Sequence, residues 1–150
     1  MHLTITISIQ GQLLDPGEIT ELLHVAPHVS RRKGDISRSP SGNQAIAHTG
    51  LWEWRLTDAA ESHSLSELLH QVHRTFLAHI NRLQSLPNAE DSLLDIHMVT
   101  DSREDGDTAL TMTFDRSAID ALAEIGLPTT MTIDRLLPDI NSATRNQTDI

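Results

Sequence analysis

The sequence repeats one short pattern near each of its ends, and this repeat restricts the fold more than any other feature. In each copy, apolar residues alternate with polar ones, mostly threonine, and an aspartate followed by apolar residues at helical spacing comes next. The alternation predicts a half-buried strand, and the later spacing predicts a short amphipathic helix. The first copy comprises a strand over 3–9 and a helix over 16–25, and the second a strand over 110–114 and a helix over 117–126. Two such units predict a pseudo-symmetric α+β domain.

The two helices correspond position by position from their aspartate to their last apolar residue. The matched pairs are Asp15 and Asp115, Ile19 and Ile119, Leu22 and Leu122, and Val25 and Ile125. We therefore expect the paired isoleucines and leucines to occupy equivalent environments against one face of a sheet. Start signals support both helices, with Asp15, Pro16 and Glu18 in the first and Ser117 and Asp120 in the second.

A strand, a long helix and a second strand are predicted between the two copies. Residues 51–56 alternate with Trp52 and Trp54 on one face, and residues 65–86 carry apolar side chains at helical spacing. A strand is predicted over 93–99. The last strand, over 130–134, is expected to point Met131 and Ile133 inward.

The predicted element order is β-α-β-α-β-β-α-β. Its last six elements spell a ferredoxin-like arrangement, and the added N-terminal strand-helix unit would extend that sheet or begin a second half-copy. We expect an α+β fold with a mostly antiparallel sheet, helices on one face, and a single domain over residues 1–137. The polar, aperiodic segment 138–150 is predicted to be a mobile C-terminal tail.

The charge and composition of the chain narrow its partners and its compartment. The 150 residues carry a formal net charge of −10, which disfavours nucleic acid and anionic membrane surfaces as partners. The chain has no cysteine, which excludes disulfides, thiolate catalysis and cysteine-ligated metals. No secretion signal and no apolar run of about 18 residues is found. These features predict a cytoplasmic protein and leave its oligomeric state open.

Several short blocks, in this order and spacing, resemble the family of domain of unknown function 4279. The blocks are Asp15-Pro16-Gly17-Glu18-Ile19-Thr20, Val25-Ala26-Pro27 followed by Lys33-Gly34-Asp35, Gly50-Leu51-Trp52, Leu122-Ala123-Glu124-Ile125-Gly126 and Ile133-Asp134. The resemblance covers residues 1 to about 137. It implies an uncharacterised bacterial single-domain protein, and it carries no catalytic residue over to this chain.

The segment 28–49 is the main candidate for a binding site, because roughly twenty residues without periodicity form an unusually long loop. One interpretation is that its clustered basic side chains clamp a phosphate or carboxylate, with Gly34 letting the backbone approach the anion. The alternative is that residues 33–35 are a simple turn and the arginines pair with the chain's own carboxylates or stay solvated. The binding candidates are Arg31, Arg32, Lys33, Gly34, Asp35, Arg38, Trp52 and Trp54.

The tryptophans and histidines also have structural explanations. Alternation accounts for Trp52 and Trp54 as core residues, although one of them would form a ligand wall if the segment 28–49 folded over their strand. His70 and His73 lie three positions apart on the long helix, within reach of one ion, but no third ligand is local. We therefore expect solvated or hydrogen-bonded histidines, with no metal site and no cofactor.

The sequence favours a non-catalytic binding or protein-interaction module, because no nucleophile, base and orienting residue occur in a recognisable catalytic pattern. Its partner would be a protein or a small anionic ligand. One concrete form is an immunity-like role, in which a small acidic protein neutralises a basic partner such as a toxin. The alternative is an enzyme of unknown reaction that uses histidines and carboxylates, with or without a metal.

Overall fold

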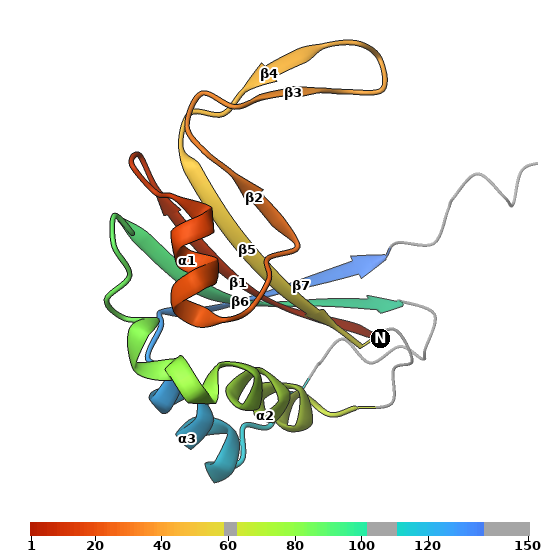
Figure 1. Ribbon diagram of the computed structural model, residues 1–150. Helices are drawn as coiled ribbons and strands as arrows, with labels where there is room; N and C mark the ends of the chain where they lie inside the picture. Colours follow the sequence, from red (N-terminus) through yellow and green to blue (C-terminus); the bar gives the residue numbers. More distant parts are fainter. Residues whose placement is uncertain (59–62, 102–110, 137–150) are drawn as a thin grey trace, which may run out of the picture.

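The computed structural model describes residues 1–58, 63–101 and 111–136, and it shows the α+β fold that the sequence predicts (Figure 1). The main sheet is mostly antiparallel, and only β6 and β7 run parallel. Its five strands are, in spatial order, β2 (Val29–Arg31), β5 (Gly50–Thr57), β1 (His2–Gly11), β6 (Asp91–Asp101) and β7 (Thr129–Leu136). The other elements are α1 (Pro16–Leu23), β3 (Ile36–Arg38), β4 (Gln44–Ile46), α2 (Leu65–Phe76), the 3-10 helix η1 (Leu77–Arg82) and α3 (Arg116–Ile125). The predicted tail over 138–150 lies outside the described residues.

Strand β1 lies at the centre of the sheet. Its residues Ile5, Ile7 and Ile9 are fully buried on one face, whereas Thr4 and Thr6 lie on the other and are half-buried. It pairs with β5 on one side and with β6 on the other. The N-terminal strand of the predicted added unit is therefore an inner strand of the sheet. A strand with one wholly aliphatic face loses the most apolar surface to water between two neighbours, which favours the central position.

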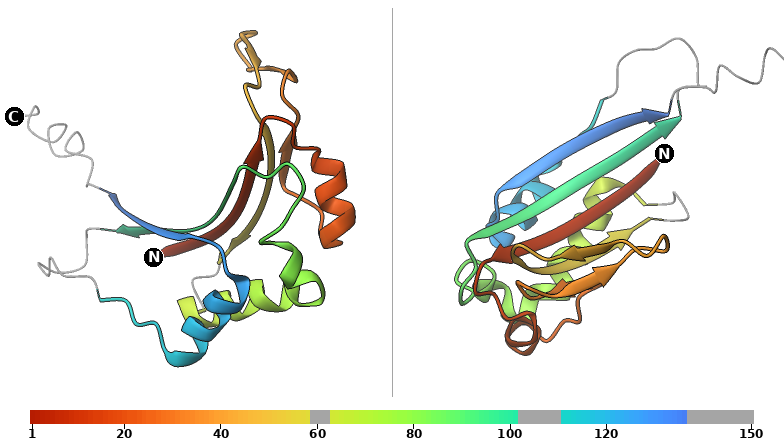
Figure 2. Two further views of the ribbon diagram at one scale, coloured as in Figure 1. Left: turned by 90° about the vertical axis from the view of Figure 1, so that its left-hand side faces the viewer. Right: turned by 90° about the horizontal axis from the view of Figure 1, so that it is seen from above.

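The three α-helices of the described residues lie on one face of the curved sheet, as predicted (Figure 2). Leu68, Val72, Phe76 and Ile80 form the expected buried stripe. The helix predicted over 65–86 is α-helical only to Phe76 and continues as η1, within which His79 has non-helical dihedral angles (φ −132°, ψ 22°). The apolar side chains stay buried through this break, so periodicity does not reveal it. None of the described helices is long and apolar enough to cross a membrane.

The two copies of the repeated pattern pack equivalently at only one of the two expected pairs. Leu22 and Leu122 are both half-buried against the core, but the isoleucines differ, so the expected equivalence of Ile19 and Ile119 is wrong. Ile19 is fully buried, whereas Ile119 is 54% exposed. Helix α3 buries Ala118, Ala121 and Ile125 instead, which lie on a different side of the helix. The reason is that α3 packs mainly against α2, whereas α1 packs against β5 and η1.

Two strand predictions in the second copy also differ from the structure. Thr111 to Phe114 are not in a strand, and Leu110 lies outside the described residues. Met112 and Phe114 pack half-buried against the core, which explains their alternation without sheet pairing. In β7, which is an edge strand of the sheet, Met131 is half-buried but Ile133 is 41% exposed.

Candidate functional site

The segment 28–49 is not an irregular loop. It begins with the short strand β2, and its middle folds into the two-stranded hairpin β3–β4, which projects from the domain (Figure 1). We call residues 36–46 the arm. Every residue from 30 to 46 is exposed. Figures 1 and 2 show the arm beyond the ends of β2 and β5, at the end of the molecule far from α2 and α3.

The arm is held by its own backbone hydrogen bonds. Ile36 pairs with Ile46 across the hairpin, and these side chains are 64% and 60% exposed. At the tip, the amide of Ser39 donates to the carbonyl of Asn43 at 2.9 Å, and the amide of Gly42 donates to the carbonyl of Ser39 at 2.9 Å. Gly42 has a positive φ of 84°, which suits glycine in a tight turn. The arm is therefore an ordered element that contributes nothing to the core.

Gly34 and Asp35, two of the predicted binding residues, lie at the base of the arm and have structural roles there. Gly34 has a φ of 91°, and its amide donates to the carbonyl of Ala47 at 2.8 Å. The Asp35 carboxylate accepts from the amide of Arg32 at 2.8 Å, and the Asp35 carbonyl accepts from the amide of Ala47 at 2.9 Å. These two residues close a turn, as the alternative interpretation of the sequence states.

The basic side chains divide into two groups. Arg32 Nη2 donates to Asp15 Oδ1 at 2.7 Å, which ties the arm base to the N-terminus of α1. This hydrogen bond lowers the pKa of Asp15, although desolvation acts in the opposite direction and raises it. The same hydrogen bond raises the pKa of Arg32. Arg31, Lys33 and Arg38 are exposed, and the described part of the chain offers them no carboxylate partner. Only these last three are available to a ligand or partner.

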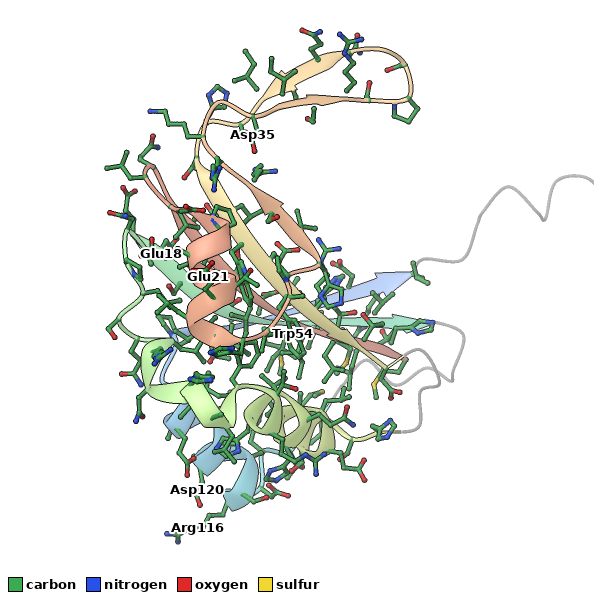
Figure 3. All side chains as sticks on the ribbon, in the orientation of Figure 1. Glu18, Glu21, Asp35, Trp54, Arg116 and Asp120 are labelled. Carbon is green, nitrogen blue, oxygen red and sulfur yellow. The ribbon has the colours of Figure 1, made fainter. Side chains whose placement is uncertain are left out.

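Trp52 and Trp54 lie in the core, as their alternation predicts; Figure 3 labels Trp54. The indole N–H of Trp52 donates to Thr20 Oγ1 at 3.0 Å. Both rings meet Phe76 edge to face, with centroids 6.4 and 5.1 Å apart. The arm does not fold over β5, so these rings do not line a site with the basic residues.

The histidines of α2 bind α3. His70 Nε2 lies 2.9 Å from Ser117 Oγ, and His73 Nε2 contacts the Glu124 carboxylate. No three metal-ligating side chains converge among the described residues. These histidines are hydrogen-bonded, and they join two helices.

The contact between His70 and Ser117 differs from a catalytic triad. The Ser117 hydroxyl donates to Asp115 Oδ1 at 3.0 Å, so its oxygen accepts from His70. Asp115 also accepts from the amide of Ala118 and, with both oxygens, from Ser66, and these bonds lower its pKa. In a triad the carboxylate binds the far nitrogen of the imidazole instead. The arrangement caps α3 and holds it to α2.

The sheet face opposite the helices carries polar pairs that the sequence analysis did not single out. His97 Nε2 lies 2.8 Å from Asp134 Oδ2, and Thr130 Oγ1 donates to Asp95 Oδ1 at 2.5 Å. The partners lie 37 and 35 positions apart and meet only through the register of β6 and β7. No signal within the sequence connects them. Their groups satisfy each other, so the arm and its base, with the unpaired Arg31, Lys33 and Arg38, are the stronger candidate site.

Comparison with known proteins assigns the chain to a protein family. The sequence model of one family, described as Domain of unknown function (DUF4279), matches residues 1–135. No curated protein and no solved structure matches the chain. The match covers the whole sheet except its last residue, together with the arm and all of the helices. The chain therefore belongs to the DUF4279 family.

Proposed function

We propose that this protein is a non-catalytic protein-interaction module and that the arm is the element that contacts the partner. The observation that carries the proposal is the exposed Ile36–Ile46 pair on an ordered hairpin outside the core. An isolated two-stranded hairpin is marginally stable in water, and exposed apolar residues on it gain from being covered. Exposed elements of this kind, carried by a rigid scaffold, are typical of binding sites.

An immunity-like role in the cytoplasm is the concrete form that we propose. In this role the protein would neutralise a partner by holding it rather than by reacting with it. A small anionic ligand at Arg31, Lys33 and Arg38 is the other form that the exposed guanidinium and ammonium groups allow. The two forms differ in whether the isoleucines are needed, since a small anion requires only the charges.

Affinity capture from the native host, with matched variants, tests the proposal. We expect wild type to retain a partner that is lost when Ile36 and Ile46 are both replaced by serine. The control is Arg116→Ala, which removes an exposed arginine at the outer end of α3 (Figure 3). A partner held equally by wild type and by the arm variant would contradict the assignment of the arm. Loss on replacing Arg31, Lys33 and Arg38 alone, with the isoleucine variant still binding, would favour the anionic ligand.

A further inference from the structure

The arm together with the residues that flank it, 29–48, differs in charge from the rest of the molecule. The segment 29–48 contains four basic residues and one acidic residue, a formal charge of +3, so the remaining residues carry −13. A basic partner would be repelled by the arm and attracted elsewhere. The surface that fits the arm therefore combines carboxylates with an exposed apolar side chain.

The chain carries such a surface itself, next to the arm. Leu13, in the turn before α1, is 77% exposed, more than any other large apolar residue among those described. Glu18 and Glu21 are exposed on α1 (Figure 3). We call these three residues the α1 patch. The patch offers one apolar contact and two carboxylates, the complement of the isoleucine pair and Arg38.

The arm and the α1 patch lie on adjacent parts of one chain. The contact between Arg32 and Asp15 joins the arm base directly to the N-terminus of α1. In a two-fold dimer each subunit presents the same surface to the other. The arm and the α1 patch must therefore lie near each other on one subunit, so that each can contact its counterpart on the other.

We propose that the arm docks on the α1 patch of a second copy of this chain, and that two copies exchange these contacts reciprocally. The inference rests on the part of the proposed function that makes the arm an interaction element, and it names a second copy, rather than a neutralised protein, as the partner of that arm. In the dimer, Ile36 and Ile46 of each copy cover Leu13 of the other, and Arg38 and Lys33 face Glu18 and Glu21. Lys33 at the base of the arm and Arg38 on it also place positive charge opposite carboxylates, at the contact between two chains that otherwise repel each other.

Sedimentation at fixed ionic strength, from micromolar to submillimolar chain, tests the dimer. We expect a concentration-dependent dimer for wild type. Replacing Ile36 and Ile46 by serine should raise the dissociation constant about tenfold or more, as expected for losing central apolar contacts. Ile119→Ser is the matched control, because it removes an exposed isoleucine on α3, and it should leave the dissociation constant unchanged. A wild-type monomer over the whole range, or a dimer indifferent to the arm variant, would overturn the proposal.

A charge exchange gives a sharper test of the pairing. One variant carries Lys33→Glu and Arg38→Glu, and the other carries Glu18→Lys and Glu21→Lys. Each should be monomeric alone, because its arm and α1 patch have the same sign, and an equal mixture should form a heterodimer. A mixture that stays monomeric contradicts the pairing. Circular dichroism checks folding. If the lysines disturb α1, Leu13→Ser tests the α1 patch in place of the charge exchange, and it should raise the dissociation constant of the dimer.

The outcomes separate this inference from the proposed function. If wild type is monomeric but the isoleucine variant still loses a host partner, the second copy is wrong and the interaction module stands. If the dimer depends on the arm but the isoleucine variant still retains a host partner, the arm mediates self-association alone.

Discussion

Helices α1 and α3 arise from the same local pattern, and the structure uses them differently. Each begins after an aspartate whose side chain accepts from a backbone amide, Gly17 for Asp15 and Ala118 for Asp115. Each ends at a residue in the left-handed conformation, His24 with φ 55° and Gly126 with φ 68°. The N-cap of α3 is Asp115, the aspartate that the repeated pattern places at the entry of this helix. The local pattern therefore determines where a helix begins and ends.

The two helices differ in what they pack against. Helix α1 buries Ile19 and Leu23 against the core, and Arg82 Nη1 donates to the carbonyl of Leu22 at 2.8 Å. Helix α3 meets α2 through a row of polar contacts from Ser66, His70 and His73. Which side of a helix faces inward depends on the neighbour that receives it, and a matched pair such as Ile19 and Ile119 does not encode that neighbour.

The largest expected effect comes from Phe76, which belongs to neither copy and contacts both tryptophans of β5. Phe76→Ala should lower the free energy of unfolding by about 3–5 kcal/mol, because it deletes buried volume. We expect one cooperative transition in urea, with tryptophan fluorescence and far-ultraviolet circular dichroism superimposing. Two separate transitions would show that the two copies unfold as independent units, and this would contradict the view that they belong to one domain.

The direct comparison of the copies is the pair Ile19→Ala and Ile119→Ala. The first should cost about 2–5 kcal/mol, because Ile19 is fully buried. The second should change stability by less than about 0.5 kcal/mol, because its side chain is mostly in water. Chemical denaturation of both variants measures the difference. Equal losses would restore the equivalence that the sequence predicts.

The polar contact between α2 and α3 predicts a smaller effect for His70→Ala. A solvated histidine would contribute less than about 0.5 kcal/mol. The hydrogen bond to Ser117 raises the expected loss to about 1 kcal/mol. His48→Ala, at an exposed position beyond the arm, is the control and should match wild type. A loss as large as that of Phe76→Ala would instead indicate a buried role for His70.

The smallest expected effect is a pH dependence of stability that arises at the C-terminal end of α1 and not at that of α3. His24, at the end of α1, stacks on His79 with ring centroids 4.5 Å apart, whereas α3 ends at Gly126. Burial, then the nearby charges of His24 and Arg82, lower the pKa of His79 from its ordinary 6.5. The unfolded chain therefore binds this proton more readily, so the contribution of His79 is complete above 6.5 and declines as the pH falls below it.

Unfolding measured from about pH 8 to about pH 5 in wild type and His79→Gln isolates this contribution. We expect the variant to lose less stability than wild type as the pH falls. His48→Gln should keep the wild-type slope. Identical slopes for wild type and His79→Gln would show that the end of α1 does not respond to protonation of this ring.

The location of the candidate site could be predicted from the sequence, but its hairpin structure could not. The length and charge of the segment 28–49 single it out, and Lys33-Gly34-Asp35 is the turn that its composition suggests. The arm itself escapes prediction, because strands of three residues are too short to show alternation. Ile36 and Ile46 lie ten positions apart, and only the hairpin register makes them one exposed pair.

The sequence by itself determined the positions of β1, α1, β5, β6, α3 and β7, the start of α2 and the burial of both tryptophans, because these follow from periodicity and capping within a few residues. Only the tertiary structure decided that β1 is central, that α3 turns Ile119 to solvent, and that Arg32 is tied to Asp15 while Arg38 is free. These features depend on which distant surfaces meet. Spacing along the chain records the period of an element but not the identity of its neighbour.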